Sequence, residues 1–423
     1  MGRKVFLSFL GTGNYKNCNY YFNDCKTTGV TYIQEAILNI FCKDWDKSDV
    51  GFVLTTSDAK NKHWQNLKSK LQKLPFLVDH IDIPTGSCER EIWDIFQKII
   101  DIIKEEDEIL IDITHGFRLM PIILSSAISY LESIKRVKIL GIYYGAFETL
   151  GNSDEIEKIP DEDRNAPIFD LTPTFTIQRW AKAAEVFEKT GSIDQIHCLS
   201  SKETKRILKE TKGKNQEAQQ IKDVVSELYK LVNEIKTCRS KDVVTNDFSI
   251  LKAKINNLKE LNIVKPLEGI LEKIHENITG FERSIINNSF AIIEWCIKYG
   301  LIQQAYTFLS ETVITFFVIL EYDLNNEINI IWDREIREKV FCSINSYFKD
   351  GANEKNTSNI KKSISWLEEH NKKEFYEKMN LLSKYRNNIN HCGYRKDLLD
   401  YKTLAEEIRG LKDYFYNILC KEE

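Results

Sequence analysis

The first third of the chain alternates short apolar runs with amphipathic segments. Continuous apolar runs, typical of strands that are buried on both faces, occupy residues 4–10, 50–54, 77–83, 108–113 and 137–147. Segments with a helical period lie between them, at residues 32–41, 64–74, 89–103 and 119–131. A further apolar stretch at 168–171 predicts a closing strand before a linker. This order predicts a doubly wound α/β sheet, rich in parallel strands and covered by helices on both faces.

The pattern changes at about residue 175, where amphipathic helices replace the strands. The expected helices are 179–189, 203–212, 217–236, 250–261, 267–280, 284–299, 301–322 and 375–390, with a polar break at 237–247. We therefore expect two domains, an α/β domain at residues 1–174 and an all-α domain at residues 175–423.

Composition narrows the class of protein. Apolar residues make up 42% of the 423 residues, which is typical of a globular chain, and no apolar run is long enough to span a membrane. The amino terminus resembles neither a signal nor a transit peptide, so we expect a cytoplasmic protein. Ten cysteines without a C-x-x-C pair favour reduced thiols over a disulfide frame or a zinc site. A net charge of −4 excludes a generally basic surface but allows a local basic patch.

A polar turn follows the fourth predicted strand, at residues 112–118. Such a turn places backbone N–H groups and a helix amino terminus at the carboxyl edge of the sheet, where open α/β sheets bind anionic ligands. Thr114 and His115 can donate hydrogen bonds there, Gly116 allows close approach of the backbone, and Arg118 adds a positive charge. The alternative is an ordinary strand-to-helix turn with a capping threonine.

Two more polar loops end predicted strands, at residues 11–15 and 55–58. The first, Gly11-Thr12-Gly13-Asn14-Tyr15, lacks the third glycine of a dinucleotide fingerprint and the Lys-Ser/Thr of a P-loop. The three loops should converge at one edge of the sheet, and none is acidic enough to hold a metal. Such an edge suits a nucleotide or a phosphate ligand.

A second candidate site lies near the carboxyl terminus, in the string Arg386-Asn387-Asn388-Ile389-Asn390-His391. A histidine can move the proton of an RNA 2′-hydroxyl or of the leaving 5′-oxygen, and an arginine can stabilise the phosphorane between them. Residues 361–396 hold nine Lys/Arg against four Asp/Glu, interleaved with aromatic residues, which suits single-stranded RNA. The alternative is a solvated helix end whose histidine lies near Gly393.

Taken together, the two motifs resemble one known family. The segment Asp112-x-Thr114-His115-Gly116 is similar to the DxTHG signature of CRISPR-associated proteins that join a CARF sensor domain to a HEPN ribonuclease domain. Arg386-Asn387-x-x-x-His391 is similar to the R-x4-H motif of HEPN nucleases. The resemblance is strongest over residues 1–190, and no motif supports it over residues 195–285.

The resemblance implies a Rossmann-like CARF domain followed by an all-α domain with a HEPN core at about residues 284–420. It implies a homodimer or higher oligomer whose CARF domains bind a cyclic oligoadenylate made in type III CRISPR defence, with the tetra-adenylate favoured over the hexa-adenylate. Binding would activate paired HEPN sites, which cut single-stranded RNA without a metal or cofactor and leave 2′,3′-cyclic phosphate ends.

The resemblance also implies roles for individual residues. Arg386, Asn387 and His391 would be catalytic, and Glu311 on a neighbouring helix would orient Arg386, unless it belongs to a solvated helix face. The residues expected to line the ligand pocket are Thr12, Gly13, Asn14, Thr114, His115, Gly116 and Arg118.

Two other hypotheses remain open at this point. The first is a non-catalytic sensor or adaptor of cyclic nucleotides, with or without ring-nuclease activity in the CARF domain. The second is a Rossmann-type redox enzyme, which is disfavoured because the third glycine and an acidic ribose partner are missing.

Overall fold

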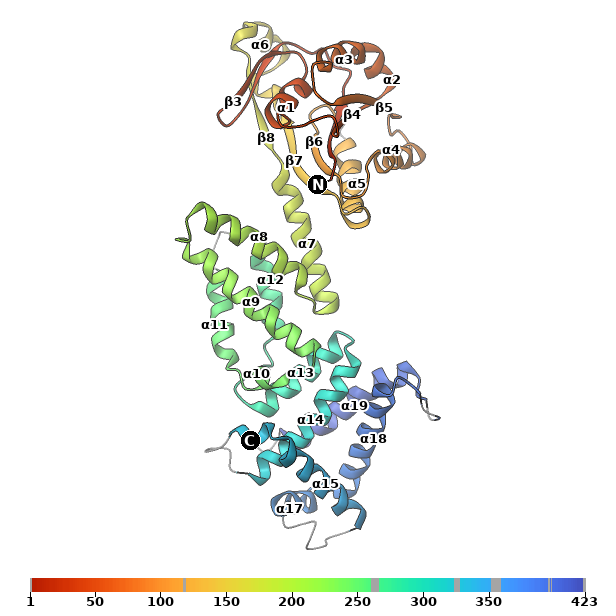
Figure 1. Ribbon diagram of the computed structural model, residues 1–423, viewed down its shortest axis with the longest axis vertical. Coiled ribbons are helices and arrows are strands. Elements are labelled where there is room, and N and C mark those ends of the chain that lie inside the picture. The colour runs from red at the N-terminus through yellow and green to blue at the C-terminus, as the bar shows by residue number, and fades with distance from the viewer. Residues whose placement is uncertain are drawn as a thin grey trace. The chain divides into compact units, whose positions relative to one another are not determined.

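The computed structural model describes residues 2–116, 119–259, 266–322, 328–350, 359–394, 396 and 398–420. The chain divides into two compact units, Met1–Thr176 and Ile177–Glu423. The first is an α/β unit and the second is built of helices (Figure 1).

One eight-stranded sheet forms the centre of the first unit, in the order β3-β2-β8-β7-β6-β1-β4-β5. The run from β7 to β5 is parallel throughout, whereas β8 is antiparallel to β7 and β3 is antiparallel to β2. The strands are β1 (Lys4–Leu10), β2 (Cys18–Phe22), β3 (Cys25–Val30), β4 (Val50–Thr55), β5 (Leu77–Asp82), β6 (Glu108–Asp112), β7 (Lys138–Gly145) and β8 (Asn165–Asp170). Each apolar run of the sequence therefore forms a strand, and the predicted mixed, parallel-rich sheet is confirmed.

Helices cover both faces of this sheet, as predicted (Figure 1). Side chains of β1 alternate between the two faces. Phe6 and Leu10 pack with helices α1 and α3, whereas Val5 and Leu7 pack with helices α4 and α5. These helices are α1 (Ile33–Phe41), α3 (Gln65–Leu71), α4 (Glu89–Ile102) and α5 (Met120–Ile134), and α3 is preceded by a short α2 (Ser57–Ala59) and the π-helix η1 (Lys60–Trp64).

The hairpin β2–β3 is not among the strands predicted from the sequence. Asn19 holds this hairpin to a distant segment, because its backbone N–H donates to the carbonyl of Arg164 at 2.7 Å and its amide donates to the carbonyl of Glu162 at 2.7 Å. Its side-chain oxygen also accepts a hydrogen bond from the N–H of Gly29 at 2.8 Å. The strands are therefore stabilised by partners far away in the sequence, which local patterning cannot reveal.

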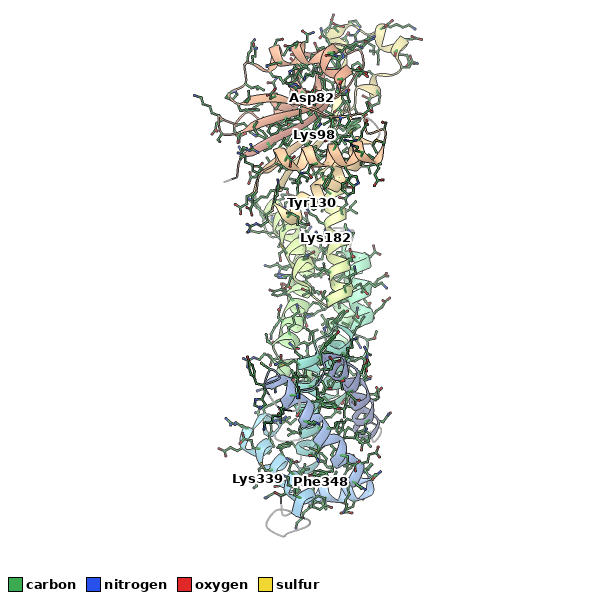
Figure 2. The ribbon with its side chains drawn as sticks, turned by 90° about the vertical axis from the view of Figure 1, so that its right-hand side faces the viewer. Asp82, Lys98, Tyr130, Lys182, Lys339 and Phe348 are labelled. Carbon is green, nitrogen blue, oxygen red and sulfur yellow. The ribbon has the colours of Figure 1, made fainter. Side chains whose placement is uncertain are left out.

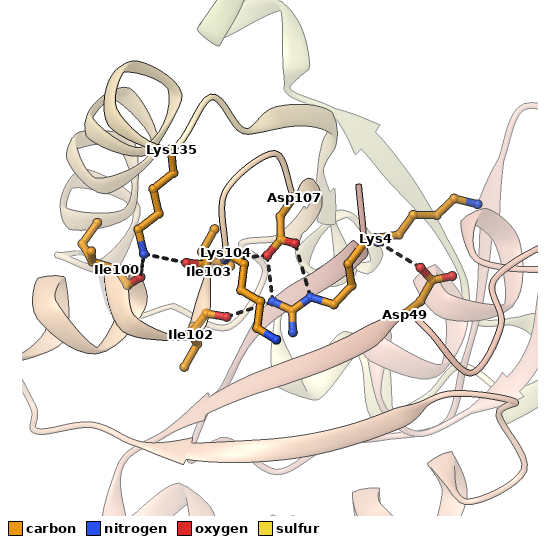
Figure 3. Close-up of polar contacts among 9 residues, drawn as sticks. Lys4, Asp49, Ile100, Ile102, Ile103, Lys104, Asp107 and Lys135 are labelled. Carbon is orange, nitrogen blue, oxygen red and sulfur yellow. Dashed lines mark hydrogen bonds and ion pairs between the residues drawn. The ribbon is translucent and has the colours of Figure 1, made fainter. Parts of the chain in front are cut away.

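The amino-terminal edge of the sheet is fixed by buried and half-buried charges (Figure 3). Arg3 pairs with the buried carboxylate of Asp107 at 2.7 Å, and that carboxylate also accepts the backbone N–H of Lys104 at 2.7 Å. The ammonium of Lys135 donates to the carbonyls of Ile100 and Ile103, both at 2.6 Å, which satisfies acceptors at the carboxyl end of α4. These contacts stabilise the amino-terminal edge of the sheet.

The second unit consists of helices around one apolar core. Its helices are α7 (Thr172–Thr190), which begins in the first unit, α8 (Asp194–Glu210), α9 (Gln216–Lys236), α10 (Ser240–Val244), α11 (Phe248–Lys259), α12 (Leu267–Asn277), α13 (Ile285–Lys298), α14 (Ile302–Glu321), α15 (Arg334–Asp350), α17 (Lys361–Glu369), α18 (Lys372–Asn390) and α19 (Tyr401–Leu419). The expected helices are present, and the polar break at 237–247 contains the short α10. Within the described ranges, no helix is both long and apolar enough to cross a membrane.

Candidate functional site

Three loops meet at the carboxyl edge of the sheet because their strands are neighbours. Strand β1 lies between β6 and β4, so the segments that follow these strands emerge side by side. They are the turn after β6, at residues 113–116, the loop at residues 11–15 after β1, and the segment after β4 that contains η1.

A buried polar network fixes the turn after β6. Asp112 is fully buried, and its two carboxylate oxygens accept hydrogen bonds from the hydroxyls of Thr114 at 2.6 Å and Ser8 at 2.7 Å. The backbone N–H of Thr114 donates to the same carboxylate at 3.0 Å, and the amide of Gln34 donates to Ser8 at 3.0 Å. Burial raises the pKa of Asp112, and the hydrogen bonds from Thr114 and Ser8 oppose this rise. Asp112, the acidic residue of the motif, therefore holds the turn in place from the interior of the protein.

The hydroxyl of Thr114 is engaged on both sides. It donates to Asp112 and accepts the backbone N–H of Gly145 at 2.8 Å, which ties the turn to the end of β7. The sequence analysis expected this hydroxyl to donate to a ligand. In the structure this hydroxyl donates its hydrogen bond to Asp112, so Thr114 acts by holding the turn in place.

An aromatic cluster joins the turn after β6 to the loop after β1. The ring of Tyr15 lies edge-on to His115, with centroids 4.7 Å apart, and edge-on to His63, with centroids 4.6 Å apart. The hydroxyl of Tyr15 accepts the N–H of Gly11 at 2.8 Å, which closes the loop on itself. Burial, with a smaller contribution from the neighbouring His63, lowers the pKa of His115 to about 4. His115 is therefore neutral at pH 7.

The loop at residues 12–14 is held by the π-helix η1. The ammonium of Lys62 donates to the carbonyl of Thr12 and to the side-chain oxygen of Asn14, both at 2.8 Å. The Nε2 atom of His63 lies 2.8 Å from the carbonyl of Gly13. Sequence reasoning missed both residues, because they lie between the polar loop at 55–58 and the helix expected at 64–74 and belong to neither.

Three further predictions concern this edge: Gly116, the hydroxyl residues at 55–58, and Arg118. Gly116 packs closely, because a Cβ atom there would lie 3.1 Å from the Cβ of Met120. The hydroxyls expected at residues 55–58 do not all face outward, since Thr55 and Thr56 are buried. Arg118 lies outside the described residues.

The second candidate site lies on α18, which packs on α14. Arg386 is half-buried and donates from Nη1 to the hydroxyl of Ser310 on α14 at 3.1 Å. From Nη2 it donates to the side-chain oxygen of Asn387 at 3.4 Å. Its Nε is buried and has no hydrogen-bond partner among the described residues. The guanidinium is thus fixed by the adjacent helix and by its own neighbour in the sequence.

His391 lies at the carboxyl end of α18 and is exposed. Its backbone N–H donates to the carbonyl of Asn387 at 3.0 Å, so the two residues are one helical turn apart. Cys392 and Gly393 follow in left-handed conformations, with φ +53° and +71°, and the helix ends before them with the imidazole at the surface. The imidazole of His391 is therefore accessible from solvent, five residues after the guanidinium of Arg386.

Glu311 does not take the partner that the sequence analysis expected. Its carboxylate pairs with Arg337 of α15 at 2.6 Å, and Arg337 also donates to the hydroxyl of Thr315 at 3.0 Å. Glu311 follows Ser310 directly on α14, and the next position on a helix points about 100° away, so the two side chains serve different neighbours. Ser310, which the sequence did not single out, is the residue that contacts Arg386.

Comparisons with known proteins concern the first unit. Residues 5–148 match the family model described as the CARF domain of the CRISPR system endoribonuclease Csx1. The chain is also similar to the CRISPR-associated protein MJ1674 of Methanocaldococcus jannaschii, with 33% identity over 128 residues, which cover 30% of this chain and 19% of that relative. The chain therefore matches only about a fifth of the length of this curated relative.

Proposed function

We propose that this chain, whose first unit is a CARF domain of the Csx1 family, is an endoribonuclease of type III CRISPR defence that cyclic oligoadenylate switches on. The proposed substrate is single-stranded RNA, and the proposed products carry 2′,3′-cyclic phosphate ends. The observation that carries the proposal is the combination of the CARF match with Arg386, which is hydrogen-bonded to Ser310 and lies five residues before the exposed His391.

The sensor part of the proposal rests on the carboxyl edge of the sheet. CARF domains bind cyclic oligoadenylates, and the loops 11–15 and 113–116 lie together at this edge through the contact between Tyr15 and His115. Backbone N–H groups at strand ends and an added positive charge suit the phosphates of such a ligand. We assign Thr12, Gly13, Asn14, His115 and Gly116 to this pocket together with Arg118, and Thr114 to its support.

The nuclease part rests on the chemistry of α18. The imidazole of His391 would take the proton of the 2′-hydroxyl or give one to the leaving 5′-oxygen. The guanidinium of Arg386 would stabilise the charge on the pentacovalent phosphorus, and the amide of Asn387 would orient that guanidinium. None of these steps needs a metal ion.

The proposal includes a homodimer. A single α18 offers one Arg386 and one His391, and general acid–base cleavage uses one group to remove a proton and one to return it. Two copies of α18 around a two-fold axis would supply both groups in one cleft. Ligand binding then controls cleavage if the ligand prefers the arrangement in which these two sets meet.

The test measures cleavage of a fluorescent single-stranded RNA by the full chain in EDTA, with and without cyclic tetra-adenylate or hexa-adenylate. We expect cleavage only with an activator, and we expect His391→Ala and Arg386→Ala to lower the rate by at least about 100-fold. Lys384→Ala is the matched control, because Lys384 is exposed on the same helix two residues before Arg386.

Each half of the proposal can fail separately. Undiminished cleavage by His391→Ala would rule out the assigned site, and a lack of activator-dependent cleavage by the wild type would rule out the nuclease. Binding of cyclic oligoadenylate without loss of RNA would instead identify a non-catalytic sensor or adaptor. Loss of the cyclic ligand itself would identify a ring nuclease.

A further inference from the structure

Resting on the proposed function, we propose that η1 forms a third wall of the cyclic-oligoadenylate site, in which Lys62 binds a ligand phosphate and His63 positions the loop at residues 12–14. Neither residue belongs to the turn or the loop that the sequence motifs single out. Both lie on the only π-helix among the described residues, which follows β4 after the short helix α2.

Lys62 is placed for this role by its contacts. Its exposed side chain reaches the loop after β1, where the ammonium lies 2.8 Å from both the carbonyl of Thr12 and the side-chain oxygen of Asn14. An ammonium has three N–H donors, and these two acceptors use two of them, so the third remains for an anionic oxygen. A phosphate beside Thr12 and Asn14 would therefore meet a fixed positive charge.

His63 is placed to hold the loop and not to hold the ligand. Its Nε2 lies 2.8 Å from the carbonyl of Gly13, which requires a proton on Nε2 for a hydrogen bond. The ring also contacts Tyr15, which in turn contacts His115 of the turn after β6. His63 thus connects all three segments of the edge. We infer that removing it loosens the loop without removing charge.

The register of η1 explains why this pair meets the loop. The π-helical segment at residues 60–64 fits one more residue into its turn than an α-helix does. Trp64 is buried in the core and anchors the segment. Lys62 and His63 instead contact the loop at residues 12–14. Such turns often mark functional positions.

The same element supplies a matched control. Lys60 has the same charge as Lys62 and lies two residues earlier, but its ammonium pairs with the carboxylate of Asp82 at 2.8 Å. The carbonyl of Asp82 accepts a hydrogen bond from Lys98 at 2.9 Å, and both residues are labelled in Figure 2. Lys60 is therefore held at the end of β5, away from the loop at residues 12–14.

The experiment measures the Kd of the full chain for cyclic tetra-adenylate and hexa-adenylate by calorimetry at two salt concentrations. We expect Lys62→Gln to weaken binding by roughly tenfold or more, because a hydrogen bond to a charged group is lost. We also expect the salt dependence to decrease for this variant, because one charge contact is gone. Lys60→Gln should bind within about twofold of the wild type.

His63 is tested by replacement and rescue. His63→Leu should weaken binding several-fold while keeping the salt dependence of the wild type, because no charge is removed. His63→Gln should recover most of the affinity, because its amide nitrogen can reach the carbonyl of Gly13 as Nε2 does. Thermal unfolding of each variant shows that the protein is folded.

The outcomes separate this inference from the proposed function. If the wild type binds a cyclic oligoadenylate and Lys62→Gln binds equally well, the inference is wrong and the proposed function stands. If the wild type binds neither cyclic tetra-adenylate nor cyclic hexa-adenylate, the inference and the proposed function are both wrong. Equal losses for Lys62→Gln and Lys60→Gln would show a general charge effect and would also overturn the role of Lys62.

Discussion

The guanidinium of Arg386 and the hydroxyl of Ser310 are joined by a hydrogen bond of 3.1 Å between helices α18 and α14. Ser310 is buried, and Nε of Arg386 has no hydrogen-bond partner among the described residues. The guanidinium also donates from Nη2 to the side-chain oxygen of Asn387 at 3.4 Å. Ser310 is therefore a positioning residue for Arg386.

We predict that Ser310→Ala lowers activator-dependent RNA cleavage by about tenfold, because loss of one hydrogen bond lets the guanidinium leave its productive position. The measurement is single-turnover cleavage, which should fall in rate with little change in RNA affinity. Ser310→Thr keeps the hydroxyl and should restore most of the rate. Equal rates for Ser310→Ala and the wild type would contradict this role.

For Glu311, unlike Ser310, we predict little effect on the cleavage rate. Because its carboxylate pairs with Arg337, Glu311→Gln should lower the free energy of unfolding by about 1 kcal/mol or less and should leave the cleavage rate within about threefold. A double-mutant cycle with Arg337→Gln measures the coupling between the two residues by urea unfolding. If Glu311→Gln abolished cleavage while the fold stayed intact, the role first expected from the sequence would be restored.

Because the pKa of His115 is lowered in the folded protein, we predict that the free energy of unfolding depends on pH. Its pKa is about 4 in the folded protein, and the ordinary value is about 6.5 in the unfolded chain. Between these values the unfolded state binds the additional proton. The contribution to stability is therefore complete above about pH 6.5 and is lost as the pH falls towards 4, with a slope of at most about 1.4 kcal/mol per pH unit.

The measurement compares urea unfolding of the full chain and of His115→Phe from pH 4.5 to 7.5, followed by hydrogen exchange in peptides of β1 and β6. The phenylalanine keeps an aromatic ring against Tyr15 but cannot bind a proton. We expect the variant to lose less stability than the wild type at low pH. Parallel pH curves for the two proteins would show that His115 does not titrate in this range.

The sequence predicted the parallel part of the sheet because those strands are buried on both faces. Strand β1 begins and ends at the predicted residues, and the remaining predicted strands differ by a few residues at their ends. The hairpin β2–β3 could not be predicted in this way. Its strands mix polar and apolar residues, and Asn19 is held by Glu162 and Arg164, which are more than 140 residues away.

The sequence predicted where the candidate sites lie. It did not predict which side chains contact one another there. Loop-forming residues after apolar runs located the carboxyl edge, since parallel strands all end at the same edge of a sheet. The sequence did not indicate that Lys62 and His63 would reach the loop at 12–14, because their register depends on a π-helical turn. It also placed Glu311 beside Arg386, although its neighbour Ser310 makes that contact.

Thr114 predicts how the turn after β6 is stabilised. Its hydroxyl donates to the buried Asp112 at 2.6 Å and accepts the N–H of Gly145 at 2.8 Å. Thr114→Val has nearly the same shape but removes both hydrogen bonds and leaves two polar groups without this partner. We predict a loss of about 2–4 kcal/mol in the free energy of unfolding, since a hydrogen bond to a carboxylate is among those lost.

Thr114→Ser is the matched control, because it keeps the hydroxyl and removes only a methyl group. It should retain most of the stability and the affinity for cyclic oligoadenylate, whereas Thr114→Val should lose both, because the turn that carries His115 and Gly116 is no longer tied to β7. Urea unfolding and calorimetric binding on the same samples measure the two effects. Loss of affinity in Thr114→Val with unchanged stability would instead mean that this hydroxyl contacts the ligand directly, as the sequence first led us to expect.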